Sequence, residues 1–310
     1  MSIQQENRPT GDDVVHVANA PVSYGAFELT VGVDPDVPSA DGVLDAIAAA
    51  GYEGVDLGPV GYFGKGEELA RALGERGLKL AGGYLEVDVT SQEGVGRGVT
   101  DLEVLMECFD AVSGGVPDDL RPRPTIALVG PGVAPGDRAG QEAKLWSNAE
   151  RALALLTEAS RRRRYEPCLH NELGTLITHD TDVARALEIS DISLCLDTGH
   201  FFAGGGDPLA ALERWGERIY QVHIKDARRE PYQRIIAELR PVSDIWNEGV
   251  FCRLGEGDAG AGDLVEALVR HNFTGWLVVE QDVLPRGPAA YAAAARDQQL
   301  NRAFLKERGV

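Results

Sequence analysis

The chain has 310 residues, of which 44% are hydrophobic and 25% are charged, with 37 Gly and 16 Pro. This ordinary composition excludes a disordered chain, a collagen-like repeat and a coiled coil. With 49 Asp and Glu against 30 Lys and Arg, the formal charge is −19, which repels phosphate backbones and anionic lipid, so we expect neither nucleic acid nor membranes as partners.

Residues 1–12 are polar and are predicted to form a flexible leader, followed by one domain over residues 13–310. They lack the apolar stretch of a secretory signal, and no run of eighteen apolar residues follows, so no membrane span is expected. The four cysteines are far apart, without a CxxC pair, and Cys168 and Cys195 lie within apolar runs. Free buried thiols are typical of a reducing compartment, so we expect a cytoplasmic protein.

After the leader, short apolar runs alternate with amphipathic stretches. The runs predict strands at residues 14–19, 53–58, 78–85, 124–130, 166–171, 192–197, 218–224 and 275–281. Helical patterns lie between them, roughly at residues 41–50, 66–76, 100–112, 141–163, 180–189, 207–215, 262–271 and 288–307. Strands that are apolar throughout are typical of parallel strands buried on both faces. Eight such units predict an α/β protein with a single-domain (β/α)8 TIM barrel. The alternative, a doubly wound open sheet, lacks its glycine fingerprint after the first strand.

The segment between the last two predicted strands is unusually long. Residues 227–262 exceed a tight connection and predict a loop insertion after the seventh strand, over the catalytic face. One interpretation is a lid that excludes water and supplies cations, because the segment carries several basic and aromatic side chains. The other is an ordinary surface loop. The side chains in question are Arg228, Arg229, Tyr232, Arg234, Trp246 and Arg253.

The last four predicted strands each end in residues that can bind a metal ion. They end in His170-Asn171-Glu172, Asp197-Thr198-Gly199-His200, His223-Ile224-Lys225-Asp226 and Glu280-Gln281-Asp282. Adjacent parallel strands lie about 4.8 Å apart, so side chains from one end of a barrel can converge. Glu172, Asp197, His223 and Glu280 would form a mainly oxygen donor set, suited to Mn²⁺, Co²⁺, Mg²⁺ or Fe²⁺, with Zn²⁺ also allowed.

The segment LCLDTGHFFAGGGDPLAALERWGERIYQVHIKDAR closely resembles the DTGH and HxKD region of the xylose-isomerase-like barrels, a superfamily of sugar isomerases, epimerases and inosose dehydratases. APVSYGAFE, GYEGVDLG, GLKLAGGYL, EGVFCRLGEGD and GWLVVEQD resemble the inosose (2-keto-myo-inositol) dehydratases in particular. The resemblance extends from about residue 14 to residue 300. It implies a metal-dependent enzyme of carbohydrate metabolism, with inositol catabolism as its setting, and a homo-oligomer.

The resemblance also implies a set of ligands. Asp197, His223 and Glu280 take the family's positions after the sixth, seventh and eighth strands. The fifth-strand position departs from the family pattern, because epimerase-like members have Glu where this chain has His170. In HNELGTLIT, Glu172 takes the place of a histidine of the dehydratase-like members. We therefore expect Glu172 to be the fifth-strand ligand, with His170 as its substitute, and Mn²⁺ or Co²⁺ as the ion.

The implied reaction is a lyase reaction that dehydrates a keto-inositol or related keto-polyol by β-elimination, through a metal-stabilised enediolate. Glu172 or Glu280 would act as the base, with Lys225 and His200 as further catalytic groups; a neighbouring cation is expected to depress the pKa of Lys225. The residues predicted to contact a small neutral polyol or keto-sugar substrate are Tyr24, His170, Asn171, Trp246 and Arg253.

The alternative functions are a ketose isomerase or epimerase, an enzyme that cleaves C-glycosides through a 3-keto sugar, and a non-catalytic sugar-binding sensor. The charge of −19 argues against a DNA-repair nuclease on the same fold.

Overall fold

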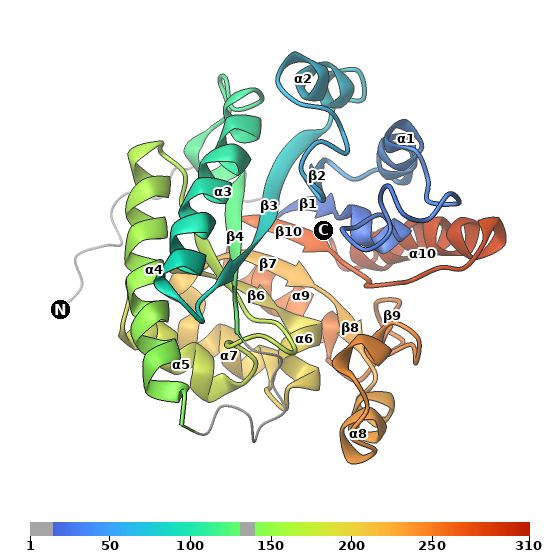
Figure 1. The fold of residues 1–310 in the computed structure, drawn as a ribbon. Coiled ribbons are helices and arrows are strands. Elements are labelled where there is room, and N and C mark those ends of the chain that lie inside the picture. The colour runs from blue at the N-terminus through green and yellow to red at the C-terminus, as the bar shows by residue number, and fades with distance from the viewer. Residues whose placement is uncertain (1–14, 131–139) are drawn as a thin grey trace.

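In the computed structural model, which describes residues 15–130 and 140–310, eight parallel strands close into a barrel (Figure 1). β10 lies between β7 and β1 and closes the barrel, with Val278 opposite His223 and Ala18 opposite Val278 on its other side. The predicted (β/α)8 fold is confirmed, whereas the predicted leader lies outside the described residues. The strands are β1 (His16–Asn19), β2 (Gly54–Asp56), β3 (Lys79–Asp88), β4 (Arg123–Val129), β5 (Cys168–His170), β6 (Ser193–Asp197), β7 (Ile219–Ile224) and β10 (Trp276–Val279).

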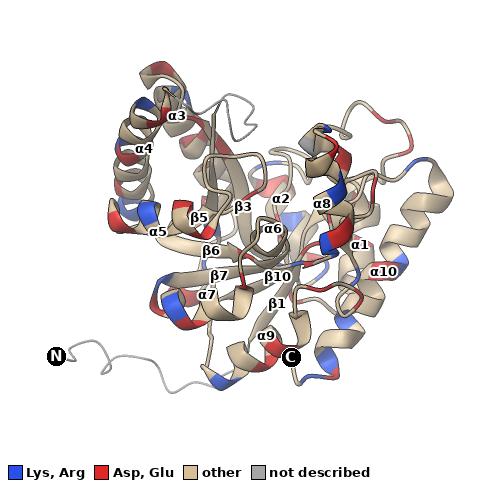
Figure 2. Ribbon diagram, turned by 90° about the horizontal axis from the view of Figure 1, so that it is seen from below, with Lys and Arg blue, Asp and Glu red and all other residues tan. Residues whose placement is uncertain are grey.

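Helices cover the outside of the barrel, and Figure 2 shows acidic and basic residues interspersed along them. Side chains cap two of these helices: Ser39 Oγ accepts from Gly42 N, and Asp207 Oδ1 accepts from Leu209 N. The outer helices are α1 (Ala40–Ala50), α2 (Glu67–Gly74), α3 (Gln92–Asp110), α4 (Glu142–Arg162), α5 (Asp180–Glu188), α7 (Pro208–Trp215), α9 (Ala261–Arg270) and α10 (Pro288–Lys306). The short α6 (Thr198–Ala203), which the sequence did not predict, follows β6 directly.

α3 starts at Gln92, eight residues before the helical pattern that we predicted from residue 100. Ser91 caps it, accepting from Gly94 N at 3.0 Å. Two glycines of this first part, Gly94 and Gly98, allow close packing on β3: a Cβ at Gly98 would lie 2.6 Å from Val87 Cγ1. The contact between helix and strand thus overrides the low helix propensity of glycine.

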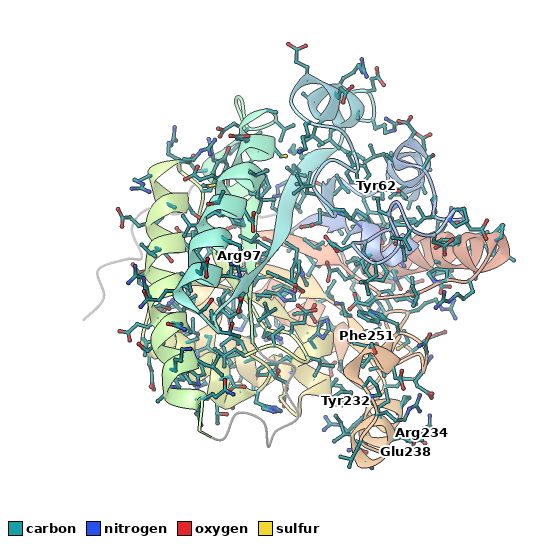
Figure 3. The ribbon with its side chains drawn as sticks, in the orientation of Figure 1. Tyr62, Arg97, Tyr232, Arg234, Glu238 and Phe251 are labelled. Carbon is teal, nitrogen blue, oxygen red and sulfur yellow. The ribbon has the colours of Figure 1, made fainter. Side chains whose placement is uncertain are left out.

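The insertion after β7 is folded. It contains β8 (Asp226–Ala227), α8 (Arg229–Ala237) and β9 (Phe251–Cys252), and β8 and β9 form a two-stranded antiparallel sheet. Its small hydrophobic core includes Ile235 and Phe251, together with Phe202 of α6. Figure 3 shows Phe251 on the barrel side of the insertion and Glu238 at its far end. The long insertion is confirmed, but it is a small packed unit where we expected a loop.

One buried carboxylate fixes the insertion to the barrel. Asp226 Oδ2 accepts from Gly255 N at 2.8 Å and from Gly257 N at 3.1 Å, while Oδ1 accepts from Ala259 N at 3.1 Å. A Cβ at Gly257 would lie 2.3 Å from Asp226 Oδ1, so only glycine allows this approach. The last residue of the HIKD motif therefore positions the segment that returns from the insertion.

The main hydrophobic core lies between the barrel and its outer helices. All four cysteines are buried and free, as predicted. Among the described residues, no helix combines the length and the apolar character needed to cross a bilayer.

Candidate functional site

Two imidazoles and two carboxylates meet at the carboxyl ends of β5, β6, β7 and β10. His170, Asp197, His223 and Glu280 each offer one donor atom, and these four atoms lie within 4.8 Å of one another. His223 Nδ1 lies 3.2 Å from His170 Nε2 and 3.2 Å from Glu280 Oε2. All four side chains are buried. Two nitrogens and two oxygens around one point form a donor set that fits a divalent transition-metal ion.

The hydrogen bonds of these four residues leave some of their lone pairs free to bind a metal ion. Among the described residues, His170 Nδ1 is buried and has no hydrogen-bond partner, while Asp197 Oδ2 is held by an ion pair with Lys225 Nζ at 3.0 Å. His170 Nε2 and His223 Nδ1 face each other, and two neutral imidazoles can share only one proton between such nitrogens. A bound cation would meet the facing lone pairs and the anionic Asp197 oxygen.

The ammonium group of Lys225 lies beside the same carboxylates. Nζ is 3.0 Å from Asp197 Oδ2, 3.1 Å from Glu280 Oε2 and 2.8 Å from Asp282 Oδ1. Burial lowers the pKa of Lys225, but the charges of Asp197, Asp282 and Glu280 outweigh burial and raise it well above its usual value. Three carboxylates around the ammonium therefore keep Lys225 protonated, and the depressed pKa that we expect beside a bound cation stays a prediction.

The surrounding charges keep the carboxylates ionised. Burial raises the pKa of Asp197, but Lys225, His200 and His170 together outweigh burial and hold it well below its usual value. Burial likewise raises the pKa of Glu280, and His223 and Lys225 reverse that effect. Both groups are thus anionic at neutral pH, the state in which a carboxylate binds a cation.

Each residue of the DTGH segment has a structural role at this point. Asp197 Oδ1 accepts from His200 N at 2.8 Å and begins α6. Thr198 Oγ1 donates to Lys225 O at 2.7 Å and accepts from Lys225 N at 2.9 Å, which joins the ends of β6 and β7. A Cβ at Gly199 would lie 2.7 Å from Lys225 Cγ, so the glycine makes room for the lysine stem. His200 Nε2 lies 3.1 Å from Asp282 Oδ2.

The predicted residues after β5 occupy three different positions. His170 belongs to the four-donor group. Asn171 bonds the backbone of Asp197, donating to its carbonyl oxygen at 2.9 Å and accepting from its amide at 3.0 Å. Glu172 Oε2 lies 3.8 Å from His170 Nδ1 and accepts a hydrogen bond from the Tyr84 hydroxyl. The structure therefore brings His170 together with Asp197, His223 and Glu280, and it places Glu172 next to this group.

The other three residues that we predicted to bind substrate each contact a different part of the chain. Tyr24 is 2% exposed within the main hydrophobic core. The Trp246 ring packs against Phe27, with centroids 5.8 Å apart. Arg253 Nε lies 3.8 Å from Asp297 Oδ1 of α10.

The arginines predicted to supply cations to the site pair with acids within the insertion. Arg228 Nη2 lies 3.5 Å from Glu256 Oε2, and Arg234 Nη2 lies 3.4 Å from Glu248 Oε2. The contact with the site is apolar instead: the Phe251 ring lies 4.7 Å from the His200 ring and 4.9 Å from Lys225 Nζ.

Two polar residues at the cluster were missed by sequence reasoning. Gln221 Nε2 lies 3.4 Å from His223 Nε2, on the side of the ring away from Glu280. Asp56, at the end of β2, is 3% exposed, and burial raises its pKa to about 6. The two-residue spacing from Gln221 to His223, and a strand ending in GVD, were signals that an inward-facing reading of each strand would have used.

A cavity of about 960 Å³ lies at the other end of the barrel, and Arg123, Glu166, Tyr220 and Gly275 are among the residues that line it. These residues precede or begin their strands, whereas the four donors lie at strand ends. The candidate site is thus identified by its chemistry and by its place at the carboxyl end, where barrel enzymes hold their active sites.

Comparison with known proteins gives a matching family model and curated relatives that cover most of the chain. The family model described as xylose isomerase-like TIM barrel matches residues 44–305. An inosose dehydratase from Bacillus velezensis is 26% identical over 273 residues, which cover 82% of this chain and 86% of that protein.

Two solved structures share the fold at low sequence identity. The IOLI protein, solved with a zinc atom, is 13% identical with a TM-score of 0.64, over 94% of this chain and 96% of that chain. The D-allulose 3-epimerase from Methylomonas sp., solved with D-allulose, is 16% identical with a TM-score of 0.64, over 95% of this chain and 97% of that chain.

Proposed function

The chain belongs to the xylose isomerase-like TIM barrel family, and from this membership we propose that it is a metal-dependent lyase that removes water from a keto-inositol or a related keto-polyol. The observation that carries the proposal is the four-donor group of His170, Asp197, His223 and Glu280. The relative named inosose dehydratase, which covers most of the chain, supports dehydration as the reaction.

We assign the fifth-strand ligand to His170, although the sequence favoured Glu172. His170 Nε2 points to His223 and Asp197, whereas its Nδ1 lies 3.8 Å from Glu172 Oε2. Glu172 thus lies on the far side of the His170 ring, beyond hydrogen-bond distance of Nδ1. Glu172 is itself held by the Tyr84 hydroxyl. Mn²⁺ or Co²⁺ suits this mixed nitrogen and oxygen set.

The charges around the site favour a neutral substrate. Burial raises the pKa of Glu28, Glu86 and Tyr84, and the nearby charge of Glu172 raises all three further, so carboxylates gather on the Tyr84 side of the cluster. Carboxylates accept hydrogen bonds from sugar hydroxyls and repel phosphate and carboxylate substituents. A polyol without phosphate is therefore the substrate class that this surface selects.

The mechanism is an elimination that needs one base and one acid. When bound, a divalent ion supplies Lewis-acid stabilisation to the negative charge that develops on the substrate's carbonyl oxygen. Glu172, which is partly exposed, takes the proton next to the ketone. As the bond from the β-carbon to its hydroxyl breaks, the departing oxygen keeps the electron pair and receives a proton from the Lys225 ammonium or from His200, so water leaves.

Surrounding residues prepare the acid. Asp197, Asp282 and Glu280 keep Lys225 protonated. Asp282 also contacts His200, and its charge, with that of Asp197, raises the His200 pKa against the effects of burial and Lys225. The Phe251 ring covers His200 and Lys225 on the side of the insertion and shields the proton transfer from water.

The test is a substrate panel with purified protein and either Mn²⁺ or Co²⁺. With 2-keto-myo-inositol we expect the ultraviolet absorption of a conjugated dione to appear, and we expect its loss in Asp197→Asn but not in Glu107→Gln, an exposed acid of α3. An epimerase would change the substrate's stereochemistry without this absorption. No turnover of keto-inositols, together with turnover of D-allulose or of a 3-keto glucoside, would assign the chain to one of the alternative reactions.

A further inference from the structure

A fifth potential metal donor lies inside the barrel below Asp197. Cys195 precedes Asp197 by two residues on β6, so both side chains point to the same face of the strand. In the sheet register Cys195 lies opposite His170 of β5 and opposite Gln221 of β7. The residue is fully buried.

The Cys195 sulfur completes a second donor group. Cys195 Sγ and one nitrogen each of His170 and His223 all lie within 4.8 Å of one another. His170 and His223 thus belong to both groups, which differ in the other donors: two carboxylates in one group and a thiol in the other.

Sulfur and oxygen donors select different metal ions. Thiolate is a soft ligand that favours Zn²⁺, Cd²⁺ and Co²⁺, whereas carboxylate favours Mn²⁺ and Mg²⁺. We propose that Cys195 is a metal ligand for soft divalent ions, which bind between His170 and His223 through a metal–sulfur bond, while Mn²⁺ is held by Asp197 and Glu280. The proposal rests on the proposed function only in that both use the same two histidines.

The metal–sulfur bond requires no oxidant or reductant. As the bond forms, the thiol releases its proton to solvent and the sulfur electron pair binds the ion, which is the usual outcome when a thiol coordinates a divalent ion. The predicted consequence is a site that holds Zn²⁺ more tightly than its carboxylates alone would allow.

Cys168 provides a matched control. It is also a fully buried cysteine of a barrel strand, two residues before His170. Its sulfur contacts Glu166 O at 3.9 Å and belongs to neither donor group. Cys168→Ser therefore reports on the loss of a buried thiol from the barrel, without the loss of a ligand.

The experiment is a titration of metal-free wild type, Cys195→Ser and Cys168→Ser with Co²⁺, Zn²⁺ and Mn²⁺. We expect Co²⁺ to produce a thiolate-to-cobalt charge-transfer band in the near ultraviolet with wild type and Cys168→Ser, and no band with Cys195→Ser. Zn²⁺ affinity should fall in Cys195→Ser by at least about tenfold, the smallest loss usual for even an outer-shell partner of a metal, while Mn²⁺ affinity stays unchanged.

Three results would overturn the assignment of Cys195. Co²⁺ binding to wild type without the band would show that the sulfur is not a ligand; if Mn²⁺ still bound, the proposed function would stand. A band that persists in Cys195→Ser would assign the sulfur contact to another cysteine. If no divalent ion bound to wild type, both this inference and the metal-dependent function would fail.

Discussion

Replacement of Lys225 by methionine tests whether the ammonium and a divalent ion neutralise the same carboxylates. Methionine has a similar length and no charge, so it leaves Asp197, Glu280 and Asp282 facing one another without their cation. At 3.0 Å and an effective dielectric constant of about 20, one such contact is worth about 5 kcal/mol before desolvation is subtracted. Removal of one partner from a buried ion pair typically costs about 3–5 kcal/mol. We therefore expect the metal-free variant to lose about that much free energy of unfolding.

The same substitution should strengthen metal binding. The ammonium lies 3.0 Å from Asp197 Oδ2 and 3.1 Å from Glu280 Oε2, so it repels any cation that these oxygens hold. Without it, we expect the Kd for Mn²⁺ to fall by at least about tenfold, a change of about 1.4 kcal/mol. Mn²⁺ at about a hundred times its Kd should then restore about 2.7 kcal/mol of stability.

The assay for Lys225→Met is urea denaturation with and without chelator, combined with calorimetric titration of Mn²⁺. Lys144→Met, on the exposed side of α4, is the control and should match wild type in both measurements. If metal-free Lys225→Met were as stable as wild type, or if it bound Mn²⁺ more weakly, the argument for a shared charge site would be refuted.

Three further predictions concern neighbouring residues. Because burial raises the pKa of Asp56 from 3.8 to about 6, the metal-free fold loses stability as pH rises between these values, by up to about 3 kcal/mol. Asp56→Asn should remove this loss, and an equal change in the free energy of unfolding from about pH 4 to pH 7 in both proteins would contradict it. Asp226→Asn turns an amide NH₂ toward backbone N–H groups that now donate to the carboxylate. We therefore expect the backbone amides of residues 255–259 to exchange with deuterium faster, while those of β6 and β7 stay protected; unchanged exchange would refute the role of Asp226 as anchor. Gly199→Ala, whose Cβ would lie 2.7 Å from Lys225 Cγ, should lower the free energy of unfolding by about 1–3 kcal/mol in thermal denaturation. Gly96→Ala in α3, with open space around it, should be neutral or stabilising, and equal effects of the two variants would contradict the packing argument.

Much of the barrel could be predicted from the sequence because its physical signals are local. β6 is a short, largely apolar run that ends in the charged Asp197, and such runs are typical of parallel strands buried on both faces. The convergence of Asp197, His223 and Glu280 followed from the fold itself, since a closed parallel barrel brings all its strand ends to one side.

The features that sequence reasoning missed depend on contacts between distant segments. α3 begins early because Gly98 packs against Val87, a contact that no local propensity encodes. Strand alternation does not separate His170 from Glu172, because residues two apart share a face; His170 is the last residue of β5 and Glu172 lies in the loop beyond it, where no strand pattern fixes the direction of its side chain. The insertion packs on Phe202 of α6, and the sequence alone did not reveal that partner.

The central claim is that His170, Asp197, His223 and Glu280 hold one divalent ion. The most direct measurement is anomalous X-ray diffraction from crystals of the protein soaked in Mn²⁺. The account predicts a single strong anomalous peak within about 2–2.5 Å of the donor atoms of these four residues. A peak at another place, or no peak and a Lys225 ammonium still between Asp197 and Glu280, would contradict it.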